Sequence, residues 1–180
     1  MAILYFHPSF IPNRSKQPLL SRMAYHAGER LTDTLTGKSY GVDKPSTAVS
    51  HQAITLPKSC PDGFRHRETL WNALNQTALA KTESIALRLN IIMPFELTEE
   101  VNWQLAMRYL ERSFIRQHFI TDAVFRTLPM GHHKQPMLVI MLPILRVNEE
   151  GFEDKPADFN ACRFMTRCRL RWVRYANREL

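Results

Sequence analysis

The spacing of apolar residues along the chain predicts five strands and four helices. Strands are indicated where apolar side chains alternate with polar ones or form a short continuous run, and helices where they recur every three to four residues. The predicted strands span residues 2–11, 49–57, 85–94, 120–128 and 136–147. The predicted helices span residues 17–31, 65–79, 97–119 and 158–180. In chain order these elements read β-α-β-α-β-α-β-β-α.

This order of elements favours an α+β fold, in which helices flank a single, mostly antiparallel, five-stranded sheet. The last two strands follow each other directly and are expected to form a hairpin. Residues 136–147 are apolar on both faces of the predicted strand, which is typical of a central strand covered by helices. Residues 32–48 are polar and turn-rich, so we expect an exposed loop or a short hairpin there. The length favours a single domain over residues 1–180.

Composition narrows the class of partner. A net charge of +7 and a pI of about 9.6 favour a polyanion, with nucleic acid as the leading candidate. Residues 163–180 hold six arginines against a single acid, Glu179. No apolar run reaches the roughly 18 residues of a membrane helix, so no membrane partner is expected. Three cysteines without metal-ligand spacing favour a cytoplasmic protein.

The predicted C-terminal helix carries two parallel stripes. One stripe is apolar and is expected to lie in the core. The other is basic, in steps of four, four, three and four residues, and consists of Arg163, Arg167, Arg171, Arg174 and Arg178. No acidic residue alternates with these arginines. Because a planar guanidinium bonds two phosphate oxygens at once, we favour nucleic-acid contacts for this stripe, with a solvated helix face as the alternative.

Two adjacent histidines, His132 and His133, precede an apolar strand in "GHHKQPMLVIML". Strands that hold a catalytic metal place its ligands at alternate positions, because residues i and i+2 share one face. The alternate positions here are Met137 and Val139. We expect the two histidines to be exposed turn residues. A metal site between them is the weaker alternative, because two ligands make a poor site.

Four stretches, in order along the chain, resemble one protein family. They are "SRMAYHAGERLTDTLTGKSY", "LWNALNQTALAKTESIALRLNIIMPFELTEE", "LPILRVNEEGF" and "RWVRYANREL". They are similar to the N-terminal helix and loop, the next helix and strand, the closing strand and the final helix of MobA/MobL-type conjugative relaxases. The similarity covers nearly the whole chain. It implies an HUH-type endonuclease fold, with an antiparallel five-stranded sheet and flanking helices.

The resemblance also implies a chemistry. In the family, a tyrosine attacks one DNA phosphodiester at the transfer origin, and a divalent metal held by three histidines polarises the phosphate. By position the tyrosine is Tyr25, the candidate catalytic residue. The three histidine positions fall on Phe125, Met137 and Val139. Valine and phenylalanine cannot ligate a metal, and methionine is too soft for Mg²⁺ or Mn²⁺.

An acidic strand of the family falls on Arg88 and Asn90, so no matched position supplies a ligand. We therefore expect no metal cofactor, with Mg²⁺ or Mn²⁺ as the alternative if nicking is retained. A metal Lewis acid contributes several kcal/mol to such a reaction, and losing about 4 kcal/mol slows it roughly a thousandfold. Nicking is expected to be absent or very slow.

A second set of basic residues surrounds Tyr25 in the sequence. In the family this region lies against single-stranded DNA, which makes the set a candidate for DNA contacts. Ordinary surface charge is the alternative. The set is Arg14, Lys16, Arg22, Arg30 and Lys38.

Three functions stay open at this point. The first is a relaxase-like DNA-binding protein of a mobile element or conjugation system, which has lost its metal and binds single-stranded or hairpin DNA. Such a protein would assist an active relaxase or join other subunits of a nucleoprotein complex. The second is an active relaxase that nicks a transfer origin through Tyr25. The third is a protein-interaction subunit that docks partners on its sheet or on residues 32–48.

Overall fold

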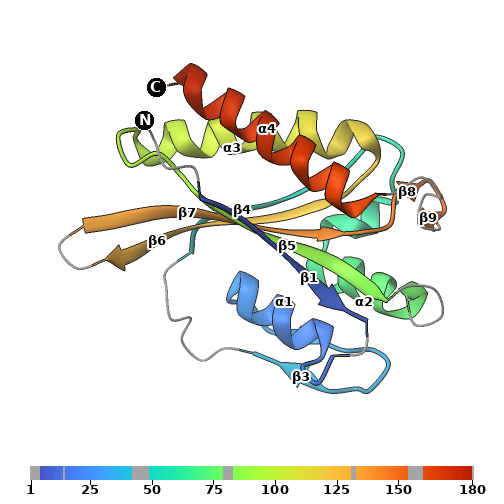
Figure 1. Ribbon diagram of the computed structural model, residues 1–180. Helices are drawn as coiled ribbons and strands as arrows, with labels where there is room; N and C mark the ends of the chain where they lie inside the picture. Colours follow the sequence, from blue (N-terminus) through green and yellow to red (C-terminus); the bar gives the residue numbers. More distant parts are fainter. Residues whose placement is uncertain are drawn as a thin grey trace.

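The centre of the fold is a five-stranded antiparallel sheet with strand order β1-β5-β7-β6-β4 (Figure 1). The computed structural model describes residues 5–13, 15–41, 49–78, 83–130, 133–153 and 160–179. The sheet strands are β1 (Phe6–Pro12), β4 (Val49–Thr55), β5 (Ser84–Ile92), β6 (Thr121–Met130) and β7 (His133–Pro143). Two short pairs flank it: β2 (Leu31–Thr32) with β3 (Ser39–Tyr40), and β8 (Val147–Asn148) with β9 (Gly151–Phe152).

Four helices cover the two faces of this sheet. They are α1 (Leu19–Ala27), α2 (Arg67–Ala78), α3 (Glu99–Ser113) and α4 (Ala161–Glu179). Helices α1 and α2 lie on one face, and α3 and α4 lie on the other (Figure 1). The predicted order of elements, the α+β class and the central position of β7 are confirmed. Among the described residues, no helix combines the length and apolar character that crossing a bilayer requires.

The helix ends follow from local chemistry. Helix α1 starts after Pro18 and stops at Gly28, which takes a left-handed φ of 69° and donates its N–H to the Ala24 carbonyl at 2.9 Å. Helix α1 is therefore shorter than the predicted span of residues 17–31. Helix α3 starts after Thr98, whose hydroxyl accepts a hydrogen bond from the Val101 N–H at 3.3 Å.

Strand β7 differs from its prediction at both ends. It begins at His133 because its outer end pairs with the outer end of β6, where Met130 faces His133 in the ladder. It ends at Pro143, four residues before the predicted end, and the chain then turns toward β8. A proline cannot donate to a ladder, so a strand commonly ends at one. Within the predicted loop at residues 32–48, the described part forms the β2–β3 hairpin.

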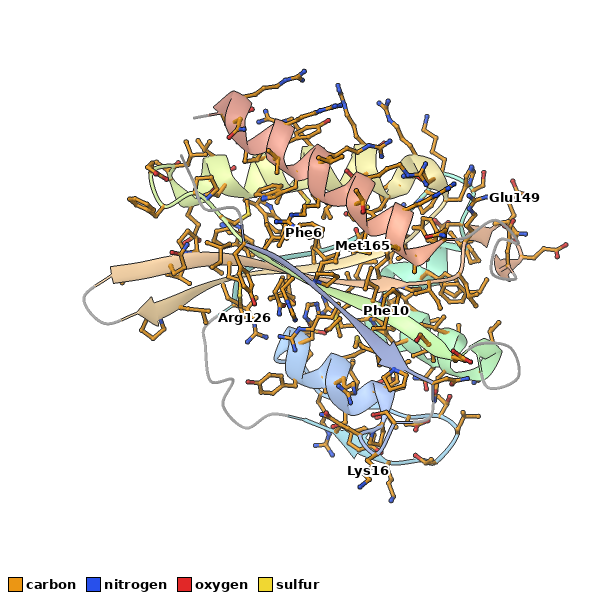
Figure 2. The ribbon with its side chains drawn as sticks, in the orientation of Figure 1. Phe6, Phe10, Lys16, Arg126, Glu149 and Met165 are labelled. Atoms are coloured by element: carbon orange, nitrogen blue, oxygen red, sulfur yellow. The ribbon has the colours of Figure 1, made fainter. Side chains whose placement is uncertain are left out.

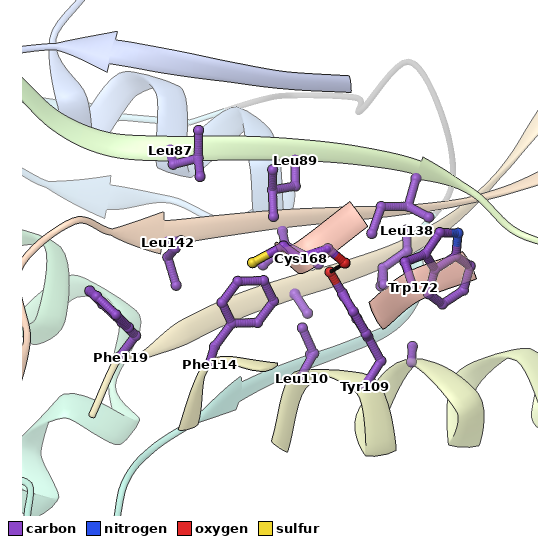
Figure 3. Close-up of a cluster of buried hydrophobic side chains, with 14 of the residues drawn as sticks. Leu87, Leu89, Tyr109, Leu110, Phe114, Phe119, Leu138, Leu142, Cys168 and Trp172 are labelled. Carbon is purple, nitrogen blue, oxygen red and sulfur yellow. Dashed lines mark hydrogen bonds between the residues drawn. The ribbon is translucent and has the colours of Figure 1, made fainter. Parts of the chain in front are cut away.

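The larger core cluster fills the space between the sheet and helices α3 and α4 (Figure 3). Its largest fully buried side chains include Tyr109, Phe114 and Trp172. The Tyr109 hydroxyl donates to the Cys168 carbonyl of α4 at 3.1 Å, which satisfies a polar group deep in this cluster. The apolar stripe predicted for the C-terminal helix supplies the α4 side of the cluster, as expected.

Alternate residues of β7 divide between the two faces of the sheet. Leu138, Ile140 and Leu142 belong to the cluster under α3 and α4. Met137 and Val139 lie on the opposite face, toward α1. This division follows from the two-residue period of a strand, and it decides which side chains reach the candidate site.

Candidate nucleic-acid interface

A groove lies between α1 and the sheet, beside Tyr25. Its volume is about 450 Å³, and Met137 and Val139 of β7 are among the residues that line it. Tyr25, in the last turn of α1, is 45% exposed and lines the groove. Phe10 of β1 borders the groove, but its ladder partner Leu87 belongs to the α3–α4 cluster, so the Phe10 ring faces the other side of the sheet. Figure 2 shows Arg126 in the layer between the sheet and α1. We call this cavity the α1–sheet groove.

Three arginines line the α1–sheet groove from three different elements: Arg22 from α1, Arg88 from β5 and Arg126 from β6. Arg88 is a cross-strand neighbour of Met141, and Arg126 is a cross-strand neighbour of Met137. The two strands that carry these arginines therefore flank β7 on both sides. No residue that lines the groove, within the described part of the chain, is acidic. The groove is an electropositive cleft, which favours an anionic ligand.

Arg126 is only 5% exposed, and its guanidinium is held by hydrogen bonds to the main chain of α1. Its guanidinium donates to the main-chain carbonyls of Tyr25, at 3.0 Å, and of His26. The same guanidinium lies 5.9 Å from the centre of the Tyr25 ring. Burial lowers the pKa of Arg126; Tyr25 opposes this change, and the nearby charge of Arg88 adds to it. Arg126 therefore ties the end of α1 to the sheet and brings its charge to the groove.

The side chains of the other two arginines each donate one hydrogen bond to a neighbouring side chain. The Arg88 Nε donates to Asn90 Oδ1 at 3.1 Å. An Arg22 terminal nitrogen donates to Ser15 Oγ at 2.8 Å. The Arg22 Nε is buried and has no hydrogen-bond partner among the described residues. A buried donor without a partner is costly to the folded state.

A buried charged network below the groove fixes the position of α1. The Asp122 carboxylate of β6 accepts hydrogen bonds from Arg67 of α2 at 2.7 and 2.9 Å and from Trp71 Nε1 at 2.9 Å. His26 Nε2 of α1 lies 3.2 Å from the Asp122 carbonyl oxygen and 3.6 Å from its carboxylate. Burial would raise the pKa of Asp122, but the hydrogen bonds and charges of His26 and Arg67 outweigh it and hold this pKa well below its usual range.

This network was not predicted from the sequence. The signal that would have indicated it is an aspartate within an otherwise apolar strand, "TDAVF", because a buried carboxylate requires charged or hydrogen-bonding partners. Since it joins α1, α2 and β6, the network orients the helix that carries Tyr25.

The three positions that the resemblance matches to the family's histidines do not converge in the structure. Met137 and Val139 line the α1–sheet groove. Phe125 is fully buried on the opposite face of the sheet, where its ring contacts the edges of His51 and Trp103. The grouping of Phe125 with the other two is therefore wrong.

The β6 residue that shares a face with Met137 is Arg126, one position further along the chain. A one-residue shift along a strand moves a side chain to the other face. Arg126, Met137 and Val139 do not fit a divalent cation, because a positive charge and two apolar side chains take the place of its ligands. Among the described residues, no group of three or more His, Cys, Asp or Glu side chains is placed to hold a metal ion.

The remaining predicted contacts near Tyr25 are dispersed. Arg22 lines the groove. Lys16, Arg30 and Lys38 are exposed, and Arg30 and Lys38 border two other depressions of the surface. Arg14 and His132 lie outside the described residues, as does the side chain of His133.

The arginine stripe of α4 lies on the other side of the sheet from the groove (Figures 1 and 2). Arg163, Arg167, Arg174 and Arg178 are exposed, and Arg171 is half-buried. Arginines of α3, which the sequence analysis did not single out, lie next to this stripe. Arg171 donates to the Arg112 carbonyl at 3.2 Å, and Arg108 pairs with Glu179. The structure therefore separates the two predicted sets of contacts.

Comparison with known proteins agrees with this architecture. The model of the MobA/MobL family matches residues 19–180. "Conjugal transfer protein TraA" of Agrobacterium fabrum (strain C58 / ATCC 33970) is 22% identical over 165 residues, which cover 86% of this chain and 14% of that protein.

A solved structure described as "Molecular Basis of Vancomycin Resistance Transfer in Staphylococcus aureus" matches with a TM-score of 0.83 and 21% identity. The match covers 98% of this chain and 92% of that one, and at this identity it shows a shared fold. Since the family model spans nearly the whole chain, the protein belongs to the MobA/MobL family of conjugative relaxases.

Proposed function

We propose that this chain is a DNA-binding domain of a conjugation or mobilisation system, which holds a single DNA strand in the α1–sheet groove and nicks it very slowly or not at all. The observation that carries this proposal is the composition of the groove. The half-exposed ring of Tyr25 stands beside three arginines, and no lining residue among those described is acidic.

This combination favours single-stranded over double-stranded DNA. Proteins that hold single strands use a positive groove for the backbone and exposed aromatic rings on which unpaired bases stack. The bases of a duplex are already stacked on each other, so they cannot use such rings. A hairpin with an unpaired end or loop would present the same groups as a free single strand.

Slow nicking follows from the residues at the family's metal positions. Tyr25 is at the edge of the groove, where a nucleophile would be needed, but Met137, Val139 and Arg126 offer no ligand for a divalent cation. Without the metal, arginines alone must neutralise the charge that develops on phosphate. A domain that binds without cutting would work in the cytoplasm beside an active relaxase or other subunits of the DNA-processing complex.

Fluorescence anisotropy with labelled oligonucleotides tests the proposal. We expect single-stranded DNA to bind more tightly than the duplex of the same sequence, with an affinity that falls steeply as salt is raised and does not change when EDTA is added. Tyr25→Ala should weaken binding by about 1–3 kcal/mol, the range for one lost stacking contact.

Phe95→Ala is the matched control, because Phe95 is 72% exposed and does not line the groove. It should leave the affinity unchanged. Equal binding of duplex and single strand, or an affinity that is indifferent to salt, would contradict DNA binding in the groove. A covalent protein–DNA adduct that forms with Mn²⁺ and is lost in Tyr25→Phe would instead establish an active relaxase.

A further inference from the structure

The three groove arginines border the same groove as Met137 and Val139, the β7 positions matched to the family's cation ligands. We propose that Arg22, Arg88 and Arg126 form a metal-free site for one phosphate group of the bound strand, next to Tyr25. This inference rests on the proposed function and deepens it, because it names the group that the groove recognises and the residues that hold it.

The geometry supplies donors from three sides. β7 forms an apolar floor, with Arg88 on β5 and Arg126 on β6 on either side of it. Arg22 reaches the same groove from α1. A phosphate is tetrahedral and presents oxygens in several directions, and each guanidinium presents a planar fork of N–H donors. A flat carboxylate would satisfy fewer of these donors than a phosphate.

The unbalanced positive charge of the site favours the binding of an anion. Arg88 and Arg126 line the same groove, and the charge of Arg88 contributes to lowering the pKa of Arg126. No acidic side chain lines the groove, within the described residues, to balance them. A bound phosphate would relieve the repulsion between the guanidiniums.

The side chains at positions 126 and 137 also explain why a cation is not expected to share the site. A divalent ion would meet the fixed charge of Arg126 beside Met137, where oxygen or imidazole ligands are needed. In this chain a positive side chain thus takes over the electrostatic role of the cation toward phosphate. It supplies charge and hydrogen bonds, but it cannot coordinate and activate the phosphate as a metal ion does.

The test uses the whole chain and probes that carry a single phosphate. A thymidine dinucleotide, its neutral methylphosphonate analogue and thymidine 5′-monophosphate are each titrated into the protein and followed by NMR. In the wild type, removal of the charge from the dinucleotide should weaken binding roughly tenfold. In Arg88→Gln this penalty should fall to about twofold or less, and excess Mg²⁺ should change neither value.

Arg88 is the informative position, because Arg126 also holds the end of α1. Arg30→Gln is the matched control: Arg30 is exposed and borders another depression, so the tenfold penalty should persist. Tighter binding of the monophosphate than of the dinucleotide would assign the site to a strand end, and the reverse would assign it to a continuous strand; both support the site.

Two results would overturn the inference: equal binding of the charged and neutral dinucleotides in the wild type, or an unchanged penalty in Arg88→Gln. These results differ from a failure of the proposed function. In that case oligonucleotides would show no salt-dependent binding in anisotropy, whatever the small probes do.

Discussion

The two faces of β7 differ in how tightly their side chains are packed. Toward α3 and α4, Leu138, Ile140 and Leu142 are at most 1% exposed and lie in a continuous aromatic and aliphatic cluster. Toward α1, Met137 and Val139 line the α1–sheet groove, which three arginines border. A second buried cluster packs under α1 and α2, so both sides of the sheet stabilise the fold. The residues that border the groove are the ones most open to change. A family member can therefore keep the scaffold and lose the chemistry, since function resides in the site.

The largest expected effect tests whether the α1 side also contributes to stability. Asp122→Asn should lower the free energy of unfolding at neutral pH by about 3–5 kcal/mol, because it leaves the buried Arg67 charge without its carboxylate. Urea denaturation measures this change. Glu29→Gln is the control: Glu29 also pairs with Arg67, at 2.7 Å, but its side chain is 40% exposed, so the loss should stay below about 1 kcal/mol.

The Asp122→Asn variant also gives a prediction for stability at acid pH. The pKa of Asp122 is lower in the folded state than the value of about 3.9 expected for an unfolded chain. Its contribution is therefore fully present well above pH 4 and is lost as the pH falls below about 4. The stability difference between wild type and Asp122→Asn should narrow in that range. A constant difference from neutral pH down to pH 3 would show that Asp122 does not carry this linkage.

The next effect compares adjacent residues on opposite faces of β7. Leu138→Ala removes a side chain that is fully buried under α3 and α4, and should cost about 2–5 kcal/mol of stability. Met137→Ala removes a half-buried side chain from the groove and should cost less than about 1.5 kcal/mol. Urea denaturation of both variants measures the contrast. Equal costs would mean that the groove floor is packed as tightly as the core.

The order of elements was predictable because the spacing of apolar residues indicates which positions are buried, whichever element packs against them. Residues 136–147 read as a covered strand, and β7 is central. The site was harder to predict. Phe125 was assigned to the metal face because the resemblance aligns strands only to within a residue, and a shift of one residue exchanges the faces. Arg126, at the next position, lines the groove.

The sequence also did not predict that the two basic surfaces lie on opposite sides of the sheet. The stripe on α4 and the residues around Tyr25 both have the spacing and charge of phosphate contacts. Charge periodicity tells which side of a helix faces solvent, but not which face of the sheet the helix covers. The strand order decides that, and it depends on pairings between residues far apart in the chain, such as Arg88 with Met141.

A triple histidine variant tests whether positions 126, 137 and 139 have the geometry of the family's cation site. Arg126→His, Met137→His and Val139→His together would place three imidazoles on one face of neighbouring strands. We expect this triple variant to bind Mn²⁺ or Zn²⁺, with a stabilisation of about 2.7 kcal/mol when the metal is at 100 times its Kd. Thermal unfolding with and without metal measures it.

The double variant Met137→His and Val139→His is the control, because two imidazoles without a third ligand should bind metal only weakly. If the double variant gains as much from metal as the triple variant, position 126 does not belong to the site. If neither gains anything, the groove floor does not have the geometry of the family's cation site.

The smallest expected effect concerns the α4 face. Arg167→Gln removes one exposed charge on the far side of the sheet, so it should weaken single-strand binding by less than about twofold, through the long-range field alone. Arg88→Gln should weaken it roughly tenfold. Anisotropy at low and physiological salt measures both, and the small effect of Arg167→Gln should disappear at the higher salt. If Arg167→Gln matches Arg88→Gln at both salt concentrations, the strand contacts both faces of the sheet and must pass around an edge of it. The separation of the two faces would then hold for the packing of the protein but not for its contacts with DNA.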